Sequence, residues 1–133
     1  MKRSVALLAF MLASVCAHAE GIPPAMFGVF TTIQDEYRDI GSHTASATRV
    51  MSVCQSVASQ VGTYDAARRK MTREQMRAVI DQKVADGWIA SEARIARVVV
   101  DYVWTLPPAG MREAMAEEKN FYVTCRLFLD RRP

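Results

Sequence analysis

The sequence has few of the residues on which enzymes and metal sites depend. It contains two histidines and three cysteines, and it has no glycine-rich phosphate loop, no Cys-x-x-Cys pair and no calcium-binding loop. His18 falls in an N-terminal segment that we expect to be removed, which leaves His43. A histidine-based metal site needs two or three imidazoles or a mixed cluster of ligands. We therefore predict no catalytic residue, no cofactor and no metal ligand.

His43 is the one histidine that a catalytic triad or a Cys-His pair could use. It lies between Ser42 and Thr44, near the expected start of a helix. Hydroxyl side chains at such a position are more simply explained as helix caps, which accept backbone N–H groups. The sequence thus favours a solvent-exposed or capping role for this region over a catalytic one.

Carboxylate pairs are the remaining candidates for acid–base chemistry, such as the cleavage of a glycosidic bond. The residues considered for such a pair are Asp35, Glu36, Glu113, Glu117 and Glu118. The last three share a predicted helix with Arg112 and Lys119, and Glu113 and Glu117 lie on a face that is otherwise polar. A solvated helix face explains these carboxylates, so we predict that the protein is not an enzyme.

The sequence also lacks any apolar run of the roughly 20 residues that a membrane-spanning helix needs. The apolar run Val5–Val15 is shorter, follows Lys2 and Arg3, and is followed by Ala17 and Ala19. A basic start, a short apolar segment and small residues before a cleavage point are typical of a secretory signal peptide. We therefore predict that residues 1–19 are removed.

Cleavage after Ala19 would leave residues 20–133 as one domain, periplasmic or secreted, without an integral membrane anchor. Cys16 could instead carry a lipid, but Val15 precedes it where a lipid-attachment site usually has a smaller residue. Removal of residues 1–19 also brings the net charge, +3 for the full chain, close to zero. A nearly neutral surface argues against nucleic acid as a partner, because such binding uses many unopposed Lys and Arg residues.

Two cysteines remain after the predicted cleavage, Cys54 and Cys125. In an oxidising compartment they are expected to form a disulfide, and two buried free thiols are the alternative. The closed loop of about 70 residues would contribute roughly 4 kcal/mol to stability in the chain-entropy treatment.

The remaining chain is rich in residues that favour helices, and it shows neither an alternating strand pattern nor an Asn-Gly turn. We predict an all-α fold, a compact single-domain bundle of about five helices with one disulfide. The predicted helix breaks lie near Gly41, Met71–Thr72, Gly87–Ser91 and Pro107–Pro108.

Local signals at the helix ends support these breaks. Gly41 and Gly87 are expected to stop helices, Gly41 in the left-handed conformation that glycine adopts most easily. The residues predicted to cap the following helices are Ser42 or Thr44, Thr72 with Gln75 as a capping box, and Ser91. The last helix is predicted over residues 109–129, with an inward stripe of Met111, Met115, Tyr122, Cys125 and Phe128 or Leu129.

Two groups of residues are candidates for an interface. Trp88, Tyr102 and Trp104 lie near predicted helix ends, and Trp, Tyr and Arg are the usual anchors of interfaces. The densest basic cluster crosses a helix break and consists of Arg68, Arg69, Lys70, Arg73 and Arg77. Packing into the core is the alternative for the aromatic residues, and cations at a solvated helix end are the alternative for the cluster.

One stretch of the chain resembles a known group of proteins. Residues Thr72 to Ile80 begin a helix with a Thr-x-x-Gln pattern, and a second apolar helix ends at Leu106, Pro107 and Pro108. Over residues 50–129 this resembles small periplasmic helical disulfide proteins, including immunity proteins against toxins delivered by type VI secretion. The resemblance implies a signal peptide, a helical domain, a disulfide and a protein partner, but it identifies no toxin-contacting residue.

Together these observations predict a periplasmic or secreted, non-enzymatic module that binds another protein, with an immunity protein or an inhibitor as one form. The alternative is a carrier of a small ligand or a lipid, in which Met and aromatic residues line a cavity between the helices. A cavity above about 300 Å³ would favour the carrier. A filled core with an exposed aromatic or basic patch would favour the interaction module.

Overall fold

The computed structural model describes residues 21–107 and 110–130, and all regular structure within these ranges is helical. The predicted signal peptide, its alternative lipid site Cys16, and Pro108 lie outside the described residues. The helices are α2 (Pro24–Glu36), α3 (Arg38–Gly41), α4 (Ala47–Ala67), α5 (Arg73–Ala85), α6 (Ala90–Val103) and α7 (Met111–Leu129). The predicted all-α fold is confirmed, with α3 as one more helix than the sequence indicated.

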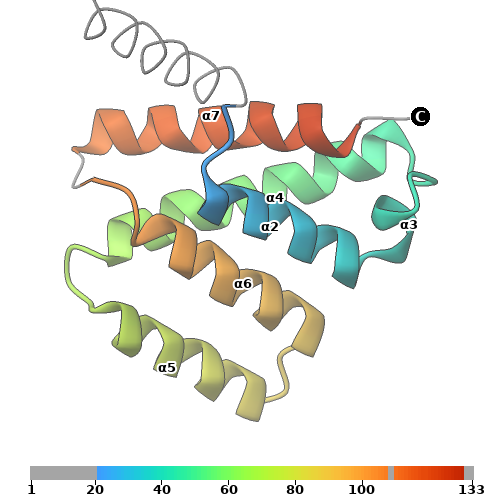
Figure 1. Cartoon of the computed structure of the whole chain (residues 1–133). Helices are drawn as coiled ribbons and strands as arrows, with labels where there is room; N and C mark the ends of the chain where they lie inside the picture. The colour runs from blue at the N-terminus through green and yellow to red at the C-terminus, as the bar shows by residue number, and fades with distance from the viewer. Residues whose placement is uncertain (1–20, 108–109, 131–133) are drawn as a thin grey trace, which may run out of the picture.

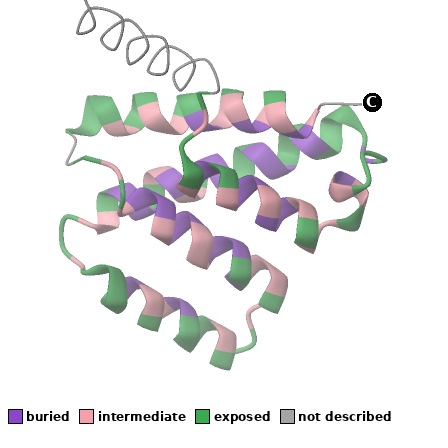
Figure 2. Cartoon of the chain, viewed as in Figure 1, coloured by how far each residue is buried: buried purple, intermediate pink, exposed green. Residues whose placement is uncertain are grey.

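The helices stack in layers around one buried core (Figure 1). α7 covers one side of a middle layer made by α2 and α4, α6 covers the other side, and α5 packs on the far side of α6 (Figure 1). Three buried aromatic rings join the layers: the centroid of Phe121 lies 5.4 Å from that of Phe30 and 5.7 Å from that of Tyr102. The purple inward faces in Figure 2 follow this core along each helix.

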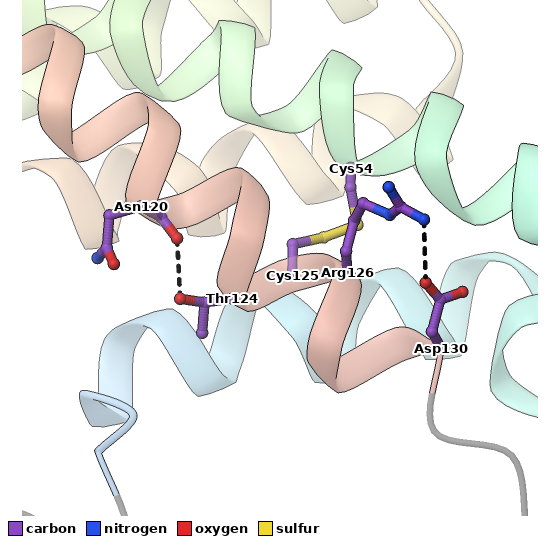
Figure 3. Close-up of a disulfide and its surroundings, with 6 residues drawn as sticks. All are labelled: Cys54, Asn120, Thr124, Cys125, Arg126 and Asp130. Carbon is purple, nitrogen blue, oxygen red and sulfur yellow. Dashed lines mark hydrogen bonds and ion pairs between the residues drawn. A yellow bond between two sulfur atoms is a disulfide. The ribbon is translucent and has the colours of Figure 1, made fainter.

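A disulfide joins α4 to α7, as predicted (Figure 3). The Cα atoms of Cys54 and Cys125 are 5.8 Å apart, within the usual range for a disulfide. Both cysteines are fully buried. The bond therefore lies inside the α4–α7 interface and closes a long loop that includes α5 and α6.

Two predicted helix ends are confirmed by their geometry. The backbone N–H of Gln75 donates to Thr72 Oγ1 at 3.1 Å, and the backbone N–H of Thr72 donates to Gln75 Oε1 at 2.8 Å, so the capping box is complete. Gly87 follows α5 with a φ of +106°, a conformation that side-chain-bearing residues rarely adopt. α5 thus begins and ends where the sequence indicated.

The predicted helix break near Gly41 is found, because α3 ends there, but the first helix does not run that far and Gly41 is not left-handed. α2 ends at Glu36, Tyr37 is extended with φ −111° and ψ 98°, and the short α3 follows. This break folds the chain back, so that a Cβ at Gly41 would collide with the carbonyl oxygen of Gln34. Gly41 is needed for this close approach to α2, and the left-handed residue is His43, with φ 59°.

The predicted caps at Ser42, Thr44 and Ser91 are also wrong. Ser46 caps α4 by accepting the backbone N–H of Arg49 at 3.1 Å. The hydroxyls of Ser42 and Thr44 hydrogen-bond to each other at 2.9 Å, within the turn that the fold-back creates. α6 begins at Ala90, before Ser91, and no side chain caps it.

Candidate functional site

The aromatic residues that the sequence singled out do not form one patch. Trp88 precedes α6 and Trp104 follows it, and a helix of 14 residues separates them by about 21 Å at 1.5 Å per residue. Both rings are half-buried against the core. The Trp88 indole N–H donates to Glu92 at 2.8 Å, and the Lys83 ammonium lies 5.3 Å from the ring centroid.

Tyr102 is in the interior, so its prediction as an interface residue is wrong. It is 1% exposed, its ring packs on Phe121, and its hydroxyl donates to Glu117. The carboxylate of Glu117, weighed above as a catalytic group, is thus a hydrogen-bond partner of a core tyrosine. Burial raises the pKa of Tyr102 above its usual value, and the hydrogen bond to Glu117 raises it further.

Arg68, from the basic cluster, is a structural residue. Its guanidinium donates to the carbonyl oxygens of Val103, Leu106 and Pro107 at 3.1, 2.6 and 2.5 Å. Its Nε also pairs with the buried Asp65 at 2.6 Å. Arg68 therefore joins the end of α4 to the end of α6 and to the segment that follows α6.

Arg73 and Arg77 are also used inside the fold, because both pair with Asp101 of α6, at 2.8 and 2.5 Å. These two ion pairs attach α5 to α6. Arg69 and Lys70 are exposed at the end of α4. Much of the charge in the predicted basic cluster is thus balanced by carboxylates of the same chain.

The groups weighed for catalysis are not assembled into a site. His43 is exposed in the turn before α4, and Glu36 pairs with Arg94 at 2.7 Å. Within residues 21–107 and 110–130 no group of three or more His, Cys, Asp or Glu side chains could hold a metal ion. No helix in these ranges is both long enough and apolar enough to cross a membrane.

The most exposed apolar surface lies on α7. Its large apolar side chains facing solvent are Met111, Met115, Val123 and Leu127, exposed by 73, 67, 47 and 68%. They recur every four residues along the helix, with Lys119 at the remaining position. Each step of four turns the direction by about 40°, so the row winds around the outer side of α7 from Met111 to Leu127. Figure 2 shows α7 at one edge of the molecule, with exposed residues recurring along the helix.

The prediction that Met111 and Met115 point inward is wrong. Phe121 and Cys125 are the fully buried residues of α7, and each methionine lies ten residues before one of them. Ten residues at 100° each fall about 80° short of three full turns, so the methionines are turned out of the inward face. The ten-residue spacing between Met115 and Cys125 already indicates that the two side chains point in different directions. The predicted inward stripe did not take this difference of about 80° into account.

Cations accompany this apolar row. Arg112, Lys119 and Arg126 recur every seven residues along α7, and Arg126 pairs with Asp130 at 3.6 Å (Figure 3). Arg112 and Lys119 have no ion pair among the described residues. Arginines that do form an ion pair include Arg49, Arg68, Arg73, Arg77, Arg94, Arg97 and Arg126. Two cations on this face therefore remain available for an anionic group of another molecule.

Two open grooves follow α7. One, of about 560 Å³, lies between α4 and α7 and includes Met115, Glu118, Lys119 and Tyr122 in its lining. The other, of about 440 Å³, continues from Tyr122 to Leu127 near the end of the helix. We call the exposed residues Met111, Arg112, Met115, Lys119, Val123 and Leu127, with the half-buried Tyr122, the α7 face.

The α7 face is held on a firm support. The disulfide fixes the C-terminal part of α7 to α4, and Phe128 stacks on Phe30 of α2 at 5.2 Å between ring centroids. A surface held in this way loses little conformational entropy when it binds, which favours affinity.

A smaller cleft of about 250 Å³ lies between α4 and α6 and is lined mainly by polar side chains. Gln60 contributes to it, and its Oε1 is buried without a hydrogen-bond partner among the described residues. Such an unsatisfied group costs roughly 1–3 kcal/mol. A hydrogen-bond donor from another molecule would remove this cost.

No protein family, no curated protein and no solved structure matches the chain. The resemblance to periplasmic immunity proteins therefore stays a prediction from the sequence.

Proposed function

We propose that this protein is a non-enzymatic interaction module that binds another protein through the α7 face. The observation that carries the proposal is the row of large apolar side chains exposed on α7, together with the unpaired cations Arg112 and Lys119. Apolar side chains in the middle of a patch, with Arg and aromatic residues beside them, are the composition that protein interfaces favour.

The partner that fits this face presents apolar side chains flanked by carboxylates. Met115 and Leu127 are each more than half exposed and would gain from burial, at about 25 cal/mol per Å² of apolar surface removed from water. Arg112 and Lys119 would each find an opposite charge, which speeds association and selects against basic partners. An amphipathic helix that lies along α7, with its carboxylates toward Arg112 and Lys119 and away from Glu118, has this chemistry.

The setting that supports this proposal is the periplasm or the extracellular space. The support is the predicted signal peptide together with the buried disulfide, since disulfides persist in oxidising compartments. An inhibitor or an immunity protein is the kind of interaction module that matches a small, stapled helical domain. Such a protein acts by covering its partner and needs no reacting group of its own.

The alternative function, a carrier with a large cavity between its helices, receives less support. The grooves above about 300 Å³ run along the outside of α7, whereas the space between the layers is filled by side chains such as Phe30, Tyr102 and Phe121. Met111 and Met115, which were predicted to point inward, face solvent.

The test uses a photo-crosslinking side chain at position 123, followed by identification and purification of the captured protein. Its dissociation constant is then measured for the unaltered protein and for Lys119→Glu and Leu127→Glu. We expect each substitution to weaken binding at least about tenfold, equivalent to 1.4 kcal/mol. The matched control is Ile89→Glu, which places the same charge at another exposed apolar residue, 60% accessible and outside α7.

Three outcomes would contradict the proposal. The captured protein could bind both α7 variants as tightly as the unaltered protein. The unaltered protein, purified by itself, could form a dimer that the substitution Leu127→Glu dissociates. That result would assign the α7 face to contact with a second copy of the chain. The same purified protein could bind vesicles of anionic phospholipid through the residues of the α7 face. That result would assign the α7 face to contact with a membrane surface.

A further inference from the structure

The polar cleft between α4 and α6 has features of a ligand site that is separate from the α7 face. One wall is a column of polar residues on α4, Ser52, Ser56 and Gln60, which recur every four residues and so share one side of the helix. Glu92 and Ile95 of α6 line the cleft from the other helix, and Tyr37 and Arg49 also contribute to the lining. Its volume of about 250 Å³ is several times the roughly 30 Å³ that one water molecule occupies in the liquid.

The polar groups of this cleft have unused hydrogen-bonding capacity. Gln60 Oε1 is buried and accepts no hydrogen bond. The hydroxyls of Ser52, Ser56 and Tyr37 make no hydrogen bond to any side chain or backbone group of the described residues. Buried polar atoms in native proteins are almost always paired, so the unpaired Gln60 Oε1 indicates that another molecule completes its pairing. The exposed hydroxyls of Ser52 and Ser56 and the half-buried hydroxyl of Tyr37 can hydrogen-bond to the same molecule.

The charges around the cleft leave a net negative site. Arg49 lines the cleft, but its charge is balanced by Asp39 at 3.3 Å, and its guanidinium lies 4.9 Å from the centroid of the Tyr37 ring. Glu36, close to Tyr37, pairs with Arg94. Glu92 accepts the indole N–H of Trp88 but has no cation partner among the described residues. One carboxylate that lines the cleft therefore remains unbalanced.

The charge of Glu92 reaches into the cleft. Burial raises the pKa of Tyr37 above its usual value, and the nearby negative charge of Glu92 raises it further. The phenol is therefore neutral at ordinary pH and can accept or donate a hydrogen bond beside the carboxylate.

We propose that this cleft binds a small molecule that carries a primary ammonium group. The ammonium has three N–H donors and no acceptor, which matches an unpaired carboxylate, an unpaired amide oxygen and serine hydroxyls. Glu92 supplies the opposite charge, Gln60 Oε1 accepts one N–H group, and the hydroxyl of Ser52 or Ser56 accepts another. The site does not depend on the proposed function, because none of these residues belongs to the α7 face.

The experiment uses the complete folded protein and simple probes. Ethanolamine and 1,4-diaminobutane carry the ammonium group, and 1,4-butanediol is the neutral counterpart. Binding is measured by calorimetry, and the side-chain amide signal of Gln60 is followed by NMR, because a ligand seated in the cleft shifts that signal directly. We expect saturable binding of the amines, a shift of the Gln60 amide signal, and binding of the diol that is at least about tenfold weaker.

Two substitutions with controls test the roles of individual residues. Glu92→Gln keeps the shape and an acceptor for Trp88 but removes the charge, so amine binding should weaken at least about tenfold. Glu74→Gln makes the same charge change at an exposed position on α5 and should leave binding unchanged. Gln60→Leu removes the unpaired oxygen, so it should abolish amine binding while the free protein unfolds at the same or a higher urea concentration.

The proposal is overturned if neither amine binds in a saturable manner while the Gln60 amide signal stays in place. It is also overturned if the diol binds as tightly as the amines, or if Glu92→Gln binds them as tightly as Glu74→Gln. In the first case Gln60 Oε1 would be satisfied by ordered water alone, and in the last case the carboxylate of Glu92 would have no role in recognition.

Discussion

Single side chains in this protein decide how separate segments are joined, and Arg68 is the clearest case. One guanidinium satisfies three carbonyl oxygens at the end of α6 and the charge of the buried Asp65. A buried ion pair of this kind contributes little net stability by itself, but loss of one partner leaves a buried charge without compensation. Removal of Arg68 should therefore cost more free energy of unfolding than the net contribution of its ion pair suggests.

We predict that Arg68→Met lowers the free energy of unfolding by about 3 kcal/mol or more, because Asp65 and the carbonyl groups lose their partner. Urea denaturation followed by circular dichroism measures the loss. Lys70→Met, two residues further on and exposed, should change stability by less than about 0.5 kcal/mol. Equal losses for both variants would show that Arg68 does not hold this end of α4.

The raised pKa of Tyr102 makes the stability of the fold depend on pH in the alkaline range. Burial and the hydrogen bond to Glu117 raise the pKa of its phenol, and burial also raises the pKa of Tyr64. The folded protein thus keeps these protons to a higher pH than the unfolded chain does. The contribution to stability is complete below about pH 10, the usual tyrosine value, and is lost as the pH rises further.

The expected slope is about 1.4 kcal/mol per pH unit for each tyrosine that stays protonated only in the folded state. Urea denaturation at a series of pH values from neutral to strongly alkaline measures this slope. Tyr102→Phe should reduce it, since that variant has no phenolic proton at this position. A slope that is the same with and without Tyr102 would contradict the assignment.

At the scale of single elements, the described glycines differ in whether their surroundings leave room for a Cβ atom. Gly28 lies inside α2, and a Cβ built there meets no atom within 4 Å. Gly41 ends α3, and a Cβ there would collide with the backbone carbonyl of Gln34. The same residue type is therefore replaceable in one helix and required in the next.

We predict that Gly28→Ala raises the free energy of unfolding by about 0.5–1 kcal/mol, because alanine favours the helix more than glycine does. Gly41→Ala should lower it, since backbone atoms cannot move aside as the end of a flexible side chain can. Urea midpoints of the two variants, measured together, check both signs. Stabilisation by both substitutions would mean that the fold-back of α3 onto α2 is not rigid.

On the scale of the whole molecule, the disulfide connects the layer of α7 to the rest of the bundle. α7 makes its largest interface with α4 and only a small one with α2, so its attachment depends strongly on one crossing. The same crossing positions the α7 face. A loss of the disulfide should therefore affect both stability and the proposed binding surface.

We predict that the double variant Cys54→Ala and Cys125→Ala loses roughly 4 kcal/mol of stability, through the greater freedom of the unfolded chain. A reducing agent applied to the unaltered protein should lower the urea midpoint by a similar amount. It should have no effect on the double variant, which serves as the control. Two thiols that react with an alkylating agent in the native, oxidised protein would contradict the bond itself.

The sequence by itself determined the helical content, the capping box of α5, the stop at Gly87 and the disulfide. Each of these depends on neighbouring residues or, for the disulfide, on there being only two cysteines after the predicted cleavage. The tertiary structure decided which way residues face: Tyr102 turned inward, Met111 and Met115 turned outward, and Arg68 became a link between segments. The physical reason is that the helical repeat of 3.6 residues fixes only the relative directions of side chains on one helix. Which of these directions is buried depends on the helices that pack against it. That choice depends on the crossings of α4 with α7 and of α4 with α6, which no local pattern in the chain specifies.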